Sequence, residues 1–170
     1  LAMAQDLDGV MVQVIDSHAA FVVDGLEIQP LPVPHDAREP VQYVFGDGNR
    51  KLGVLTDTGC STPHIETMLA GVDALVLECN HDAAMLESGP YPASLKRRVG
   101  GRFGHLENGQ SAALLDKLKH DKLQCVMAAH VSRKNNTAAL AQRALAQVLG
   151  CADGDVRVAC QTTGFDWIRI

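Results

Sequence analysis

Short runs of hydrophobic residues broken by turn sequences fill the first part of the chain and predict β-strands. The segments with this pattern are residues 10–15, 20–23, 26–31, 41–45 and 51–56. Turn signals separate several of them, at Asp24-Gly25 and at Gly46-Asp47-Gly48. We therefore expect an antiparallel meander in which residues 51–56 form a hairpin with residues 41–45.

From residue 61 the pattern changes to alternating helices and strands. Thr62 followed by Pro63 is a typical helix start, and Gly150 is a typical helix end. We expect helices at residues 63–69, 81–87, 94–99, 108–119 and 137–149, and strands at 73–78, 123–129, 156–159 and 165–170. Since no repeat or linker interrupts the chain, we interpret residues 1–170 as part of one α/β domain.

Composition and charge narrow the classes of function. Hydrophobic residues make up 46% of the chain and charged residues 21%, which is ordinary for a globular protein. The net charge of -5 excludes a generally basic surface, so any nucleic-acid binding must rest on a local patch or a bound cation. The longest apolar stretches fall far short of the roughly 20 residues that span a bilayer, so we expect no membrane segment.

The five cysteines are widely spaced, odd in number and without a Cys-X-X-Cys pair. This pattern is typical of reduced thiols, so we expect a cytoplasmic protein. The chain starts at Leu1 without an initiator methionine or a signal sequence, and we expect that this is not a natural start.

Polar residues recur at strand ends and beside glycines, where ligands and catalytic groups gather in α/β proteins. Asp57 ends an apolar segment, and His35, His105 and His130 lie in similar contexts. Imidazole and carboxylate are the ligands that zinc and manganese favour. Each of these residues taken alone also has a purely structural explanation. His35 is typical of a hydrogen-bonded turn and Asp57 of an Asx turn. His105 is compatible with a helix cap and His130 with a hydrogen-bonded position in the core. Because the four occur together, we favour a metal site.

Two further segments leave alternatives open. Residues 78–82 read Glu-Cys-Asn-His-Asp. We expect Asn80, His81 or Asp82 to orient a metal-bound histidine. Alternatively, Asp82 caps the helix that follows. The basic run at residues 95–98, preceded by Tyr91, indicates either a solvated helix face or a contact for substrate phosphates.

The motifs, in this order, resemble the metallo-β-lactamase superfamily. They are His-Asp-Ala at 35–37, Thr-Asp-Thr-Gly at 56–59, Glu-Cys-Asn-His-Asp at 78–82, Gly-His-Leu-Glu-Asn at 104–108 and Ala-His-Val-Ser with Asn-Asn at 129–136. Within the superfamily the chain is similar to bacterial metal-dependent hydrolases of the YycJ (WalJ) type, from about residue 26 to the C-terminus.

The resemblance implies a fold, a cofactor and roles for individual residues. The fold would be the C-terminal two-thirds of an αββα sandwich that binds two zinc or manganese ions. His35 and His130 would each bind one ion, Asp57 would bridge both, and His105 would contact the scissile phosphate or protonate the leaving group. The residues implied to orient these groups or to contact substrate are Asp36, His81, Asp82, Asn108 and Ser132.

Two departures from the family pattern change the expected activity. The family's His-X-His-X-Asp-His motif is absent from this sequence, and Glu107 replaces the serine that often precedes Asn108. We therefore expect the chain to bind metal weakly or not at all and to be inactive alone, and we expect its parent protein to be a phosphodiesterase or a DNA exonuclease.

Alternatives are a non-catalytic binding domain and a hydrolase of thioesters or lactones. The absence of the N-terminal strands also leads us to expect a homo-oligomer that covers an open sheet.

Overall fold

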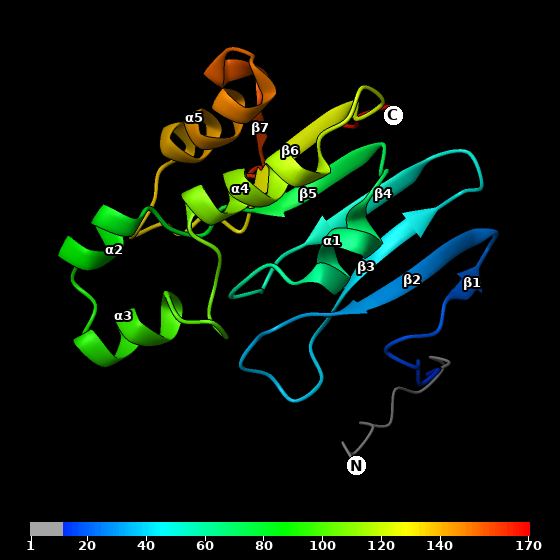
Figure 1. The fold of residues 1–170 in the computed structure, drawn as a ribbon, viewed down its shortest axis with the longest axis horizontal. Helices are drawn as coiled ribbons and strands as arrows, with labels where there is room; N and C mark the ends of the chain where they lie inside the picture. The colour runs from blue at the N-terminus through cyan, green and yellow to red at the C-terminus, as the bar shows by residue number, and fades with distance from the viewer. Residues whose placement is uncertain (1–11) are drawn as a thin grey trace.

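A computed structural model describes residues 12–170, and the strands of this part of the chain form one mixed sheet. Its strands lie in sequence order, β1-β2-β3-β4-β5-β6-β7 (Figure 1). Neighbours from β1 to β4 are antiparallel, whereas β4, β5, β6 and β7 are parallel. The strands are β1 (Phe21–Val23), β2 (Leu26–Pro32), β3 (Val41–Gly46), β4 (Lys51–Leu55), β5 (Ala74–Glu78), β6 (Cys125–Ala129) and β7 (Arg157–Val158).

Helices follow the parallel strands. They are α1 (Pro63–Leu69), α2 (Ala83–Ser88), α3 (Ala93–Val99), α4 (Asn108–Leu118) and α5 (Ala138–Leu149), followed by a short 3-10 helix, η1 (Asp153–Asp155). Local sequence sets their ends: the Thr62 side chain accepts a hydrogen bond from the Ile65 amide at the start of α1, and Gly150 ends α5 with a φ of 68°. Helices α1, α4 and α5 cover one face of the sheet, whereas α2 and α3 lie beyond the ends of the strands (Figure 1).

The hydrophobic core lies between the sheet and helices α1, α4 and α5. It contains fully buried leucines from the strands, Leu31, Leu55 and Leu77, and helix residues such as Leu115 and Leu145. Burial of this many aliphatic side chains provides the main stabilising free energy of the fold. None of the helices in the described residues is both long and apolar enough to span a membrane.

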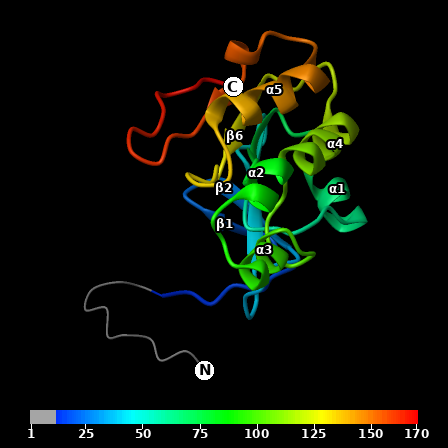
Figure 2. The same ribbon diagram turned by 90° about the vertical axis from the view of Figure 1, so that its left-hand side faces the viewer.

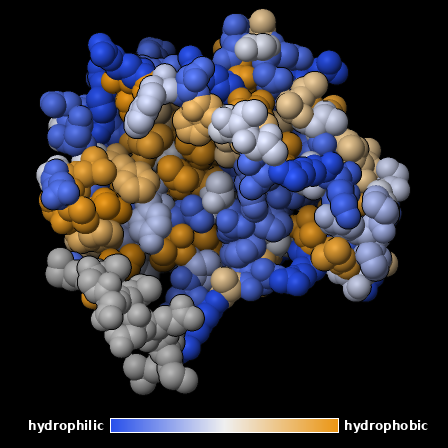
Figure 3. All heavy atoms as spheres, turned by 180° about the vertical axis from the view of Figure 1, so that it is seen from behind, coloured by the Kyte–Doolittle hydropathy of each residue, from blue (hydrophilic) through white to orange (hydrophobic). Residues whose placement is uncertain are grey.

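The opposite face of the sheet is apolar, and no helix of residues 12–170 covers it (Figure 2). The C-terminal segment lies along this face (Figure 2). Its residues 165–168 and 170 and the strands line a cavity of about 550 Å³. Hydrophobic residues gather on this side of the molecule (Figure 3), and the Trp167 side chain is fully exposed. We call the apolar surface formed by Leu52, Val76 and Phe165 the outer face.

The sequence predictions of the helices and of the strands in the middle of the chain are confirmed to within a few residues. The hairpin between β3 and β4 forms as expected, and the turn between β1 and β2 uses Asp24 and Gly25 with φ values of 49° and 83°. Two predicted strands are wrong. Residues 165–170 have no partner strand, and of the segment 10–15, residues 10 and 11 lie outside the described residues while 12–15 form no strand. Alternating hydrophobic residues form a strand only where a neighbour supplies hydrogen bonds.

Candidate metal centre

Asp57 and His130 occupy equivalent places at the ends of β4 and β6, the two strands that flank β5. Asp57 has a φ of 51° and His130 a φ of 53°, a left-handed backbone conformation that is uncommon for residues other than glycine. Such conformations cost free energy and persist where the surrounding structure fixes them, often at functional sites. The sharp turn at each strand end therefore brings the two side chains to the same edge of the sheet.

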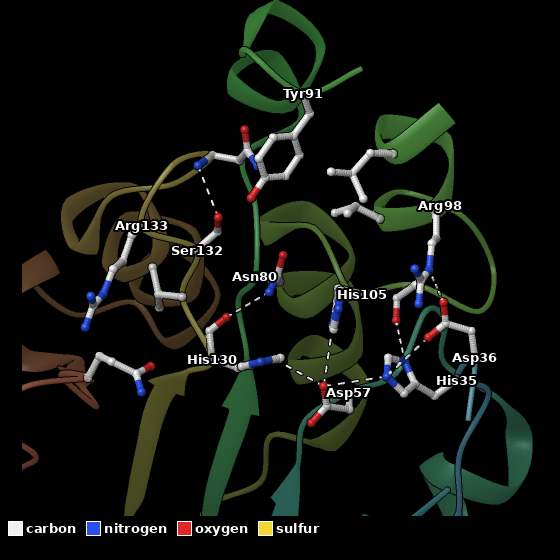
Figure 4. Close-up of a pocket in the computed structure, with 16 residues that line it drawn as sticks. His35, Asp36, Asp57, Asn80, Tyr91, Arg98, His105, His130, Ser132 and Arg133 are labelled. Atoms are coloured by element: carbon white, nitrogen blue, oxygen red, sulfur yellow. Dashed lines mark hydrogen bonds and ion pairs between the residues drawn. The ribbon is translucent and has the colours of Figure 1, made fainter. Parts of the chain in front are cut away.

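One carboxylate oxygen of Asp57 faces three imidazole rings (Figure 4). Asp57 Oδ1 lies 3.7 Å from His35 Nε2, 3.8 Å from His105 Nδ1 and 3.7 Å from His130 Nδ1. These separations are too long for hydrogen bonds. The four residues line a pocket of about 460 Å³ that opens to solvent, and the Asp57 side chain is 41% exposed.

Glu78 lies beneath these residues at the end of β5, and its side chain is fully buried. Its Oε1 accepts hydrogen bonds from His105 Nδ1 at 2.8 Å and from His130 Nδ1 at 2.7 Å. Its Oε2 accepts from the backbone amides of Thr58 at 3.1 Å and Leu106 at 3.3 Å. Burial alone would raise the pKa of Glu78, but these hydrogen bonds lower it to about 2. Glu78 is therefore an ionised carboxylate that fixes two of the three imidazole rings.

Hydrogen bonding also orients the histidines. The hydrogen bond to Glu78 raises the pKa of His130 against the opposing effect of burial. A neutral imidazole that donates its Nδ1 proton keeps a lone pair on Nε2, which is the form that binds a metal. His35 instead contacts the Gly104 carbonyl oxygen through Nδ1 at 3.0 Å, and its Nε2 lies 3.6 Å from Asp36.

Two motif glycines allow the loops that carry these residues to touch. A Cβ atom added to Gly59 would lie 2.3 Å from the Arg102 carbonyl oxygen, and one added to Gly104 would lie 2.1 Å from the Val99 carbonyl oxygen. Only glycine permits this backbone contact. Gly59 thus brings the Asp57 loop against the loop that carries His105.

A buried network of asparagines joins the ends of β5 and β6 to the start of α4. The side chains of Asn108 and Asn136 exchange two hydrogen bonds, at 3.0 and 2.8 Å, and Asn136 also donates to the Cys79 carbonyl. The Asn80 side chain donates to the His130 carbonyl oxygen at 3.0 Å. These bonds satisfy backbone groups that the irregular loops leave without partners, and so hold the loops of His105 and His130 together.

The structure brings together His35, Asp57, His105 and His130, the four residues that the sequence predicts at the centre of the site. Asp36 and Ser132 line the same pocket, and Asp36 pairs with Arg98. Three other predicted residues do not line it. Asp82 caps α2 by accepting from the Met85 amide, His81 is buried beside α4, and Asn108 lies in the asparagine network.

Sequence reasoning did not place Glu78 among the site residues. The available signal was a carboxylate that ends the otherwise apolar segment 74–78, since a buried acid needs hydrogen-bond partners. Glu107, the departure from the family motif, starts α4, where its amide donates to the Gln110 side chain at 3.0 Å. The hydrogen bond between His105 and Glu78 forms without any contribution from the Glu107 side chain.

The donor set fits a divalent cation. Among the described residues, Asp57, Glu78, His105 and His130 each offer a ligand atom, and these atoms lie within 4.8 Å of one another. Imidazole nitrogen and carboxylate oxygen are the ligand types expected for such an ion. Since Glu78 already accepts four hydrogen bonds, it suits the role of orienting the ligands better than that of a ligand.

Comparison with known proteins places these residues in a family context. A family model described as a beta-lactamase superfamily domain matches residues 1–130, so the match starts well before residue 26, where we expected the likeness to begin. An exodeoxyribonuclease YycJ of Bacillus anthracis is 39% identical over 73% of this chain and 47% of its own length. An exodeoxyribonuclease WalJ of Streptococcus pneumoniae is 31% identical over 78% of this chain and 49% of its own length.

The chain spans about half the length of these curated relatives. Among solved structures, a metallo-beta-lactamase fold protein, YhfI from Bacillus subtilis, superposes with a TM-score of 0.67. The superposition covers 90% of this chain and 52% of YhfI at 14% sequence identity, which shows a common fold.

Proposed function

The chain belongs to the metallo-β-lactamase superfamily, and from that premise we propose that it is part of a metal-dependent hydrolase that cleaves phosphodiester bonds in DNA. The observation that carries the proposal is the convergence of His35, His105 and His130 on one oxygen of Asp57, above the buried Glu78. The bacterial relatives named above, both exodeoxyribonucleases, support DNA as the substrate.

We propose that His35, Asp57 and His130 are the residues of this chain that bind metal, zinc or manganese, with Asp57 between two ions. Bound divalent ions would polarise the phosphodiester and lower the pKa of a water molecule. Three ligands are fewer than two ions require, so we expect residues 1–170 alone to bind metal weakly and to be inactive, and the remaining ligands to come from elsewhere in the whole protein.

His105 is proposed to act on the substrate and not on a metal. Because its Nδ1 proton is donated to the ionised Glu78, the opposite nitrogen, Nε2, remains for the substrate. The imidazole is proposed to donate a proton to the leaving oxygen or to contact the scissile phosphate. The hydrogen bond to Glu78 fixes the orientation of the His105 ring before substrate binds.

The test measures hydrolysis of bis-p-nitrophenyl phosphate and end-labelled DNA by the protein at the length its gene encodes, with manganese or zinc. Asp57→Ala is expected to lower turnover by about 100-fold or more, because the bridge between the ions is lost. Asp116→Ala, an exposed aspartate on α4, is the matched control and should leave turnover unchanged. Unchanged turnover in Asp57→Ala, or none in the wild type with metal bound, overturns the proposal.

We further propose a homo-oligomer in which the outer face packs against a second copy. The apolar cavity between the strands and residues 165–170, with exposed Phe165 and Trp167 beside it, supports this proposal. Sedimentation velocity at micromolar concentrations should give a dimer, and a monodisperse monomer would count against it. A reducing cytoplasmic location is also proposed, in keeping with five free cysteines.

A further inference from the structure

The wall of the pocket above the metal centre differs in chemistry from its floor. The floor carries Asp57 and the histidines, whereas the wall is formed by the Tyr91 segment between α2 and α3 and by the loop that follows β6 (Figure 4). We propose that this wall binds an unpaired nucleotide next to the scissile bond, so that the protein acts on single-stranded DNA or on frayed ends. The inference rests on the proposed function and specifies the form of its substrate.

Tyr91 supplies an aromatic ring at the mouth of the pocket. Its side chain lines the pocket, and the Lys134 ammonium lies 5.8 Å from the ring centroid, within the range of a cation–π interaction. This contact joins the α2–α3 segment to the loop after β6. Stacking of a base on an aromatic ring requires a base free of its partner strand, and it is independent of base identity.

The loop after β6 supplies hydrogen-bond donors and positive charge. Ser132 Oγ accepts hydrogen bonds from the backbone amides of Lys134 at 3.4 Å and Asn135 at 3.2 Å, which leaves its hydroxyl proton free to be donated. Arg133 lines the pocket, and within residues 12–170 no acidic side chain pairs with it. These are the groups that bind a phosphate oxygen.

The positive charge at this wall contrasts with the net charge of the whole chain, which is -5. Arg98, on the other side of the pocket, is paired with Asp36, whereas within residues 12–170 no acidic side chain pairs with Arg133 or Lys134. A polyanionic strand is therefore attracted to the pocket along the loop after β6.

The shape of the pocket favours one strand over two. Its volume of about 460 Å³ suits a single small ligand. Asp57 lies at its floor, between α3 residues such as Leu95 and Val99 on one side and the Ser132 loop on the other. In the proposed binding mode a single strand reaches Asp57 between these walls without unpairing, whereas a duplex does so only where its end is frayed.

The test is fluorescence anisotropy with a labelled oligothymidylate and a blunt duplex of equal length, in EDTA so that no cleavage occurs. Because a blunt duplex must first unpair, the single strand is expected to bind at least about tenfold more tightly. Tyr91→Ala should weaken single-strand binding about 5- to 150-fold, and Tyr91→Phe, which keeps the ring, about twofold or less. Trp167→Ala, an exposed aromatic on the outer face, is the control and should bind as wild type.

The contribution of the Arg133 charge is tested separately, by the dependence of single-strand affinity on salt concentration. Arg133→Ala should weaken binding and reduce the slope of log affinity against log salt by about 0.7, the loss of one phosphate contact on a single strand. Arg143→Ala on α5, which pairs with Asp153, is the matched control and should leave the slope unchanged.

Equal affinity for single strand and duplex, no binding to either, or wild-type binding by Tyr91→Ala overturns the inference. Circular dichroism of each variant distinguishes loss of contact from loss of fold. Single-strand binding without metal-dependent hydrolysis would refute the proposed function and leave this inference standing.

Discussion

The buried carboxylate of Glu78 accepts a 2.8 Å hydrogen bond from Nδ1 of His105. The same oxygen accepts from His130, so one acid at the end of β5, which lies between β4 and β6, orients residues from two separate loops. The relationship joins the fold to the chemistry, because the position of β5 in the sheet fixes the direction of two imidazole rings that approach from opposite sides.

Glu78→Gln should weaken metal binding about 10- to 100-fold, since loss of a residue that orients a metal-binding histidine typically has this effect. The amide is neutral and no longer favours a donated Nδ1 proton on His130. The measurement is competition for zinc with a chromophoric chelator. Glu27→Gln on β2 is the matched exposed control, and equal affinities in both variants would contradict a role for Glu78 in orienting the ligands.

Gly104→Ala should lower the free energy of unfolding by at least about 2 kcal/mol, because the new methyl group would overlap the Val99 carbonyl oxygen at 2.1 Å. Urea denaturation measures the change. Gly154→Ala in η1 is the control, since a Cβ there meets no atom within 4 Å, and it should change stability by less than about 0.5 kcal/mol. A similar small change in Gly104→Ala would show that the loops separate easily.

The Asn108 and Asn136 side chains should be energetically coupled. Each single change to alanine leaves a buried amide without its partner and should cost about 1–3 kcal/mol of unfolding free energy. The double variant removes both amides, so its cost should be less than the sum by about 0.5 kcal/mol or more. A double-mutant cycle in urea measures this coupling, and strictly additive costs would mean that the reciprocal hydrogen bonds contribute no coupling.

Asp73 directly precedes β5 and lies at the end of that strand remote from the metal centre. It should make the free energy of unfolding depend on pH. Its carboxylate accepts from the Lys51 amide at 2.8 Å and from Arg50 at 3.0 Å, and the first of these bonds lowers its pKa most. A group whose pKa is lower in the folded state stabilises the fold above its unfolded pKa, and this stabilisation is lost as the pH falls through the folded value.

The difference in unfolding free energy between wild type and Asp73→Asn should therefore be largest above about pH 4 and shrink at lower pH. Urea denaturation across this range measures it. Asp121→Asn, an exposed aspartate on the α4–β6 connection, should show no such trend. A constant difference across the range would exclude the ionised carboxylate as the cause.

Much of the secondary structure follows from local signals in the sequence. Thr62-Pro63 starts α1, Gly150 ends α5, and Asp24-Gly25 turns between β1 and β2, because caps and turns depend on residues close in the chain. The alternating segment 165–170 shows the limit of this reasoning. Its pattern suits a strand, but a strand also requires a neighbour, and sequence does not reveal which edge is available.

The sequence by itself also indicated four residues of the site, since His35, Asp57, His105 and His130 each follow a strand or a glycine and strand ends in such folds meet at one edge. The tertiary structure decided the rest: that one Asp57 oxygen faces three imidazoles, that Glu78 lies below them, and that Asp82 caps α2 instead. The physical reason is that hydrogen bonds across 27 to 52 residues of sequence depend on the packing of whole strands, which no local pattern encodes.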